Sequence, residues 1–111
     1  MRREPRTDLM RSTDLSDPSG LGFRLYSTRL RLLYRLKKEG FYVRMHAYEY
    51  LAGDEEGFLA LIFLEPWVGR CFILPLRHSE KIAEILKLIE KLDTSIKVET
   101  IKRNNKNLML P

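Results

Sequence analysis

The side chains that could carry out chemistry in this 111-residue sequence are few and scattered. His46 falls among the tyrosines of a predicted strand, and His78 precedes a predicted helix. A single histidine in either place is more often a surface or capping residue than a general base. Cys71 stands between Arg70 and Phe72 in an apolar segment. No neighbouring base would activate its thiol, so Cys71 is predicted to be a core residue, and these residues predict no catalytic set.

The acidic residues concentrate at one place, Asp54, Glu55 and Glu56, in a predicted turn between Gly53 and Gly57. Adjacent carboxylates could hold a cation, but in such a turn they more often keep the loop solvated. A single cysteine excludes a multi-cysteine zinc site. The glycines at 20 and 22 lack the Lys-Ser/Thr pair of a phosphate-binding loop. We therefore expect no metal and no cofactor.

Basic residues gather in the segment 24–44, which has seven Lys or Arg and one Glu and therefore a net charge of +6. The net charge of the whole chain is +5. Segment 49–65 has five acids and no base, a net charge of −5. Guanidinium groups beside Tyr26 and Tyr34 could bind a polyanion. The alternative is a set of surface ion pairs worth about 0–1 kcal/mol each. The predicted nucleic-acid contacts are Arg29, Arg31, Arg35, Lys38 and Arg44.

These residues are positioned by one predicted α/β domain over residues 21–111, preceded by a flexible arm over residues 1–20. The first helix is predicted over 26–38, with Gly40 after its end. Its apolar face is expected to hold Tyr26, Leu30, Leu33 and Tyr34. Strands are expected over 41–50, 58–64, 70–76 and 96–102. The second helix starts after Ser79 and runs to Leu92.

Two segments have unusual apolar character. Residues 58–64 form an unbroken apolar run, which predicts a central strand covered on both faces. Leu108, Met109 and Leu110 form an apolar terminus that could add a strand to a sheet, in this chain or across a subunit boundary.

The apolar runs end within ten residues, whereas a membrane helix needs about 20. Residues 1–20 are polar and show no secretory signal. We expect no membrane partner and a cytoplasmic location. The absence of Gln and the abundance of Glu, Lys, Arg, Leu and Ile are typical of a thermophile.

The expected order, helix, three strands, helix, strand (αβββαβ), resembles the restriction-endonuclease-like fold. The closer resemblance is to the C-terminal domain of the archaeal tRNA-splicing endonuclease, through a basic helix that runs into a Gly-aromatic-x-Val strand over residues 32–44. That family cleaves RNA with a Tyr, a His and a Lys. The matching positions here are Leu61, Gly69 and Thr94. In the archaeal Holliday-junction resolvases, which are also similar, the metal-binding Asp and Glu-x-Lys correspond here to Gly57 and residues 75–77.

The resemblance therefore implies a noncatalytic structural subunit of a heterotetrameric tRNA-splicing endonuclease, with a catalytic subunit and precursor tRNA as partners. It implies that residues 108–110 pair with the catalytic subunit. It also implies that an acidic loop, for which Asp54, Glu55 and Glu56 are the candidates, enters a basic cleft. The alternative is a free-standing nucleic-acid-binding protein derived from a Holliday-junction-resolvase-like nuclease. A nuclease that uses His46, His78 or the acidic triplet is the third reading.

Overall fold

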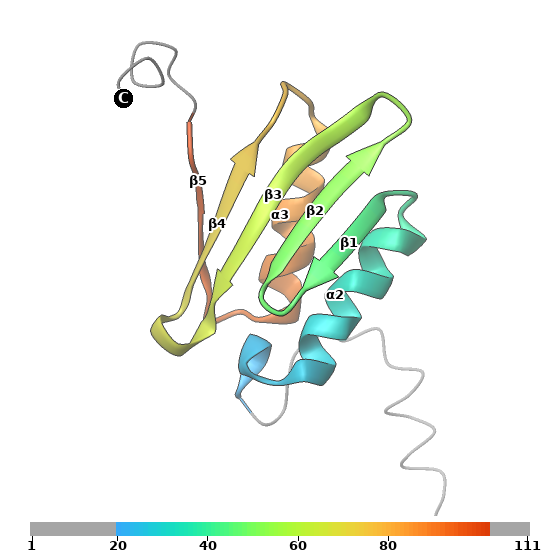
Figure 1. Cartoon of the computed structure of the whole chain (residues 1–111). Helices are drawn as coiled ribbons and strands as arrows, with labels where there is room; N and C mark the ends of the chain where they lie inside the picture. The colour runs from blue at the N-terminus through green and yellow to red at the C-terminus, as the bar shows by residue number, and fades with distance from the viewer. Residues whose placement is uncertain (1–19, 103–111) are drawn as a thin grey trace, which may run out of the picture.

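The computed structural model describes residues 20–102, which form a mixed α/β fold with one five-stranded sheet and two α-helices (Figure 1). The helices are η1 (Gly22–Arg24, 3-10), α2 (Tyr26–Lys38), η2 (Pro66–Val68, 3-10) and α3 (Lys81–Leu92). The strands are β1 (Tyr42–His46), β2 (Glu49–Asp54), β3 (Gly57–Glu65), β4 (Arg70–Pro75) and β5 (Lys97–Thr100).

The strands lie in the order β1-β2-β3-β4-β5, the order in which they occur in the chain. The first four form an antiparallel meander. β5 runs parallel to β4, and α3 provides the crossover that such a parallel pair requires. Among the described residues, β1 and β5 are therefore the two edges of the sheet.

Both helices pack on the same face of the sheet. Leu32 and Leu36 of α2 join Ile85 and Ile89 of α3 and the sheet residue Ile62 in one buried cluster. The helices also contact each other, and in the view of Figure 1 α3 lies behind the sheet. Because the buried apolar side chains gather between the sheet and the helices, the described chain has two layers.

The sequence predicted one strand over 41–50, and this is wrong. The segment forms the hairpin β1–β2, with a turn at Ala47, whose φ is +56°. The turn lacks the Asn, Asp or Gly that normally favours positive φ, and packing holds it instead. The Tyr48 ring meets Trp67 edge-on at 5.1 Å, and the Tyr48 carbonyl accepts a 2.9 Å hydrogen bond from Leu64. The element order is thus helix, four strands, helix, strand.

The predicted bounds of α2 are confirmed, but its predicted apolar face is wrong. Tyr26 and Tyr34 are more than half exposed, and the residues buried are Thr28, Arg29, Leu32 and Leu36. The helix can bury an arginine because neighbouring groups accept its charge. Arg29 Nη1 donates to the carbonyl oxygens of Phe23 at 2.8 Å and of Arg24 at 3.2 Å. Its guanidinium carbon lies 4.1 Å from the centroid of the Tyr48 ring.

The segment before α2 is fixed to the far end of α3. Asp93 Oδ2 accepts a 3.1 Å hydrogen bond from the backbone of Phe23, a fully buried residue. Asp93 Oδ1 accepts from the backbone and the hydroxyl of Ser95. Gly22 has a φ of +56°, and a Cβ at this position would lie 1.9 Å from Asp93 Oδ2. Only glycine therefore fits here without a rearrangement.

Two other predictions, those for Gly40 and Cys71, are confirmed. Gly40 has a φ of +101° and ends α2, while its N–H donates to the Lys37 carbonyl. Cys71 is fully buried, and burial raises the pKa of its thiol to about 12. No helix within residues 20–102 has the length and hydropathy that crossing a membrane would require.

Candidate functional site

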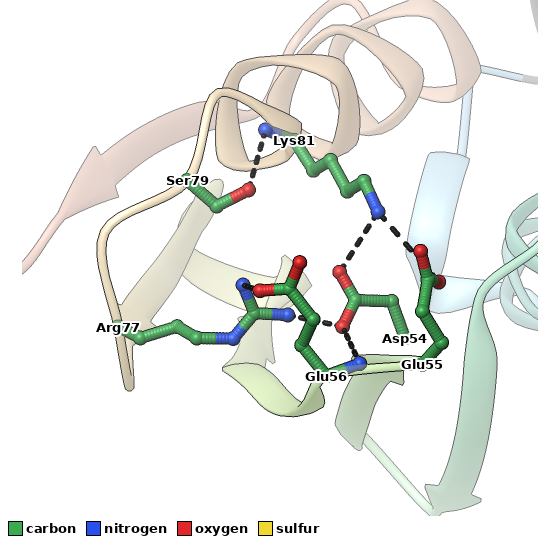
Figure 2. Close-up of polar contacts among 6 residues, drawn as sticks. All are labelled: Asp54, Glu55, Glu56, Arg77, Ser79 and Lys81. Atoms are coloured by element: carbon green, nitrogen blue, oxygen red, sulfur yellow. Dashed lines mark hydrogen bonds and ion pairs between the residues drawn. The ribbon is translucent and has the colours of Figure 1, made fainter.

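Asp54, the last residue of β2, lies where the β2–β3 turn meets the loop before α3 (Figure 2). The strand pairing shifts between Ala52 and Gly53, a bulge that re-aims the residues after it. A Cβ on Gly53 would lie 2.9 Å from the carbonyl oxygen of Gly57, so the close approach of the two strands requires glycine there. Asp54 Oδ1 accepts a 2.9 Å hydrogen bond from the backbone of Glu56, which fixes the turn.

Arg77 and Lys81 converge on the Asp54 carboxylate from two sides, as Figure 2 shows. Lys81 Nζ lies 2.8 Å from Oδ2, and Arg77 Nη2 donates to Oδ1. The Asp54 side chain is only 3% exposed. The hydrogen bonds from Lys81 and then Arg77 hold the pKa of Asp54 well below its usual range, and the same contact raises the pKa of Lys81.

This charge cluster joins three parts of the chain. Asp54 comes from β2, Arg77 from the loop after β4, and Lys81 from the first turn of α3. The Ser79 hydroxyl accepts a 3.1 Å hydrogen bond from the backbone of Lys81 and so caps α3, as the sequence predicted. The lowered pKa of the ion-paired Asp54 carboxylate makes it a weak base, and the raised pKa of Lys81 keeps its amine protonated, so that it is not a nucleophile. The geometry supports a structural role, in which Asp54 holds the β2–β3 turn against the loop after β4 and the start of α3.

The other two residues of the acidic triplet project into solvent. The Glu55 side chain is 81% exposed and the Glu56 side chain 71% exposed. Both make only long ion pairs: Glu55 Oε1 lies 4.0 Å from Lys81 Nζ, and Glu56 Oε1 lies 3.5 Å from Arg77 Nη1. Of the predicted acidic interface residues, Asp54 is therefore neutralised within the chain, and Glu55 and Glu56 are accessible to a partner.

A groove of about 440 Å³ opens beside the cluster, at the carboxyl ends of β4 and β5. Leu76, Ile82 and Ile101 are apolar residues of its lining, and Arg77 and His78 contribute polar groups. No cluster of three or more His, Cys, Asp or Glu residues that could hold a metal occurs within residues 20–102.

The predicted nucleic-acid contacts separate into three places. Arg31, Arg35 and Lys38 share one side of α2, since they are spaced by four and three residues. Arg29 is buried at 8% exposure and belongs to the core side of the same helix. Arg44 is exposed on β1, on the face of the sheet opposite to the buried Val43.

The second face of the sheet carries an apolar surface that no described residue covers. Leu51 of β2 pairs with Leu61 of β3, and Leu61 pairs with Leu74 of β4. In the next row Phe63 pairs with Phe72. All five side chains are half-buried, whereas Ile62 and Ile73 on the helix-covered face are fully buried. We call the surface of Leu51, Leu61, Phe63, Phe72 and Leu74 the open sheet face.

The rim of the open sheet face is charged and balanced. Its basic residues are Arg44, Arg70 and Lys97, and its acidic residues are Glu49, Glu65 and Glu99. Arg70 and Glu65 form an exposed ion pair at 3.3 Å. An apolar centre with a polar rim of both signs is the usual organisation of a protein interface.

No protein-family model, curated protein or solved structure matches this chain.

The two histidine candidates lie far from each other in the fold. His46 is at the β1–β2 turn, while His78 follows the opposite end of β4, beside α3. Leu108, Met109 and Leu110 lie outside the described residues. Sequence reasoning missed the open sheet face as a site, although one signal was present: the apolar run of β3 predicted cover on both faces.

Proposed function

We propose that this chain is a noncatalytic structural subunit that assembles with a catalytic protein through its open sheet face. The observation that carries the proposal is the uneven cover of β3. The strand has apolar residues on both faces, and within residues 20–102 the two helices cover only one of them. A partner that buried Leu61, Phe63 and Phe72 would remove apolar area from water at about 25 cal/mol per Å².

The charge distribution favours a protein as the occupant of this face. The rim has three basic and three acidic residues, so its formal charge is zero apart from His46. A polyanion would be attracted by an excess of basic groups, whereas a protein surface can match both signs. Apolar patches of this kind on a soluble domain commonly mark interaction sites.

The chemistry of the described residues agrees with a noncatalytic role. The ionised Asp54 and protonated Lys81 neutralise each other, and the raised pKa of Cys71 keeps its thiol protonated. His46 and His78 are separated by the length of the sheet and so cannot act together on one substrate. A catalytic partner would supply the groups that this arrangement lacks.

The specific partner follows from the resemblance of residues 32–44 to the archaeal tRNA-splicing endonuclease. The proposed complex is heteromeric, with a catalytic endonuclease subunit that removes the intron from precursor tRNA and this chain as its structural subunit. In this reading the five-stranded sheet represents the restriction-endonuclease-like fold. Residues 108–110 and the exposed Glu55 and Glu56 remain the predicted secondary contacts with the catalytic subunit.

The test is co-expression with a candidate catalytic subunit from the same source. We expect the two chains to co-elute in size-exclusion chromatography and precursor-tRNA cleavage to depend on both. Separate elution, together with cleavage that is indifferent to this chain, would refute the proposal. Co-elution without any effect on tRNA cleavage would retain the assembly role and refute the tRNA-splicing role.

A further inference from the structure

The solvent side of α2 carries a row of cations that no carboxylate within residues 20–102 neutralises. Arg31, Tyr34, Arg35 and Lys38 stand at positions i, i+3, i+4 and i+7 of the helix, so they share one side. We call these four residues the basic ridge. The helix contains no acidic residue, and its last turn has three basic ones. This concentration of one sign contrasts with the balanced rim of the open sheet face.

The cations of the basic ridge have no carboxylate partner within the described chain. Arg70, Arg77 and Lys81 each form an ion pair with a carboxylate. Among residues 20–102, no ion pair involves Arg31, Arg35 or Lys38. Arg31 and Lys38 are exposed, whereas Arg35 is partly buried and its Nε atom is shielded from solvent. Because no described carboxylate pairs with them, the charges of the three residues remain for an anion from elsewhere.

An aromatic ring stands within this row. Tyr34 is 60% exposed, one of the most exposed large apolar side chains of the described chain, and it lies one helical turn from both Arg31 and Lys38. Exposure of this kind has no role in the core, which α2 reaches through Leu32 and Leu36. An exposed ring between cations suits an unpaired base, which stacks on the ring while its flanking phosphates meet the cations.

We propose that the basic ridge binds a single-stranded segment of nucleic acid, with Arg31, Arg35 and Lys38 on the phosphates and Tyr34 against a base. The inference does not depend on assembly through the open sheet face, because the two surfaces lie on different layers of the fold. If the proposed function holds, the ridge gives the subunit a direct contact with the precursor tRNA.

The experiment measures binding of the full chain to a fluorescent single-stranded RNA oligonucleotide by anisotropy, as a function of salt. Two double variants, Arg31→Ala with Lys38→Ala on α2 and Lys87→Ala with Lys91→Ala on α3, remove the same charge from exposed helix positions. For the α2 pair we expect a loss of at least tenfold in affinity. The slope of log K against log salt should become shallower by about 1.4, or about 0.7 per lost phosphate contact. The α3 double variant should leave both the affinity and the salt slope nearly unchanged.

Tyr34→Leu tests the stacking contact. Stacking on an aromatic ring is worth about 1–3 kcal/mol per base, so we expect a loss of about 5-fold to 150-fold in affinity without a change in the salt slope. The comparison ligands are single-stranded DNA of the same length and sequence, duplex RNA, and anionic vesicles. Single-stranded RNA or DNA should bind more tightly than duplex RNA or vesicles.

Three outcomes would overturn the inference. The first is an equal loss from the α2 and α3 double variants, which would mean that net charge alone attracts the oligonucleotide. The second is equal or tighter binding to anionic vesicles, which would assign the ridge to a membrane surface. The third is no binding by the wild-type chain at low salt. In each case assembly with a catalytic subunit can still be measured separately, so failure here is distinguishable from failure of the proposed function.

Discussion

Phe63 of β3 and Phe72 of β4 are direct cross-strand partners on the face of the sheet that neither helix covers. Both side chains are half-buried, although their chain neighbours Ile62 and Ile73 are fully buried on the other face. The guanidinium carbon of Arg70 lies 5.4 Å from the centroid of the Phe72 ring. This pair lies within the surface through which we propose that the chain assembles.

The two faces of β4 should respond differently to truncation. Ile73→Ala removes a fully buried side chain and should lower the free energy of unfolding by about 2–5 kcal/mol. Phe72→Ser removes a larger but only partly buried side chain and should cost less, about 1–2 kcal/mol, because part of the ring is already in contact with water. Urea unfolding followed by circular dichroism gives both values. A loss for Phe72→Ser as large as that for Ile73→Ala would mean that the isolated chain already covers this face.

The Asp54 cluster predicts a specific loss of stability in acid. Because the contacts with Lys81 and Arg77 lower the pKa of the folded carboxyl below its ordinary value of 3.8, the contribution of Asp54 is complete above about pH 4. It should be lost as the pH falls further and the carboxylate is protonated. Asp54→Asn should therefore lower the free energy of unfolding at pH 6 and change it much less at pH 2.

The matched control for this prediction is Glu56→Gln, which alters an exposed carboxylate next to the same cation. We expect its free energy of unfolding to follow the wild-type pH dependence within about 0.5 kcal/mol, as is usual for exposed ion pairs. The measurement is urea unfolding at several pH values. A pH dependence that is the same for the wild type and Asp54→Asn would show that the cluster does not couple Asp54 to folding.

The contact between Gly22 and Asp93 predicts an unusual sensitivity to one methyl group. Gly22→Ala would place a Cβ 1.9 Å from Asp93 Oδ2 at a φ of +56°, so the Phe23–Asp93 hydrogen bond should break. We expect a loss of at least about 2 kcal/mol in the free energy of unfolding. Gly40→Ala is the control, since its φ is also positive but no atom lies within 4 Å of its Cβ.

Gly40→Ala should lower the free energy of unfolding by about 1–2 kcal/mol, from backbone strain alone. Thermal or urea unfolding of both variants separates the strain from the clash. Equal losses would contradict the claim that Asp93 fixes the segment before α2.

The helices could be predicted from the sequence because their signals are local. The end of α2 follows from Gly40, and α3 begins beside the capping hydroxyl of Ser79. The β1–β2 turn could not be predicted, because Ala47 has no intrinsic preference for positive φ. Contacts of Tyr48 with distant residues hold the turn instead.

The site was only partly predictable, because its contacts are distant in sequence. Burial of Arg29 depends on carbonyl groups that η1 presents only after it packs on the fold. The pairing of Asp54 with Lys81 joins residues 27 positions apart. The apolar run of β3 indicated two buried faces. A sequence pattern does not specify whether the second cover comes from the same chain, however, so the open sheet face became visible only with the sheet topology.

The mass of the native complex tests the central claim most directly. This chain would be co-expressed with a candidate catalytic subunit as wild type, as Phe63→Lys, and as the control Tyr34→Lys, which places the same charge on the other layer of the fold. Native mass spectrometry should find wild type and Tyr34→Lys in a species whose mass is the sum of whole copies of this 13.1 kDa chain and of the catalytic subunit. Phe63→Lys should be a folded monomer. A Phe63→Lys chain that assembles like the wild type, or a wild-type chain that remains at 13.1 kDa, would contradict the account.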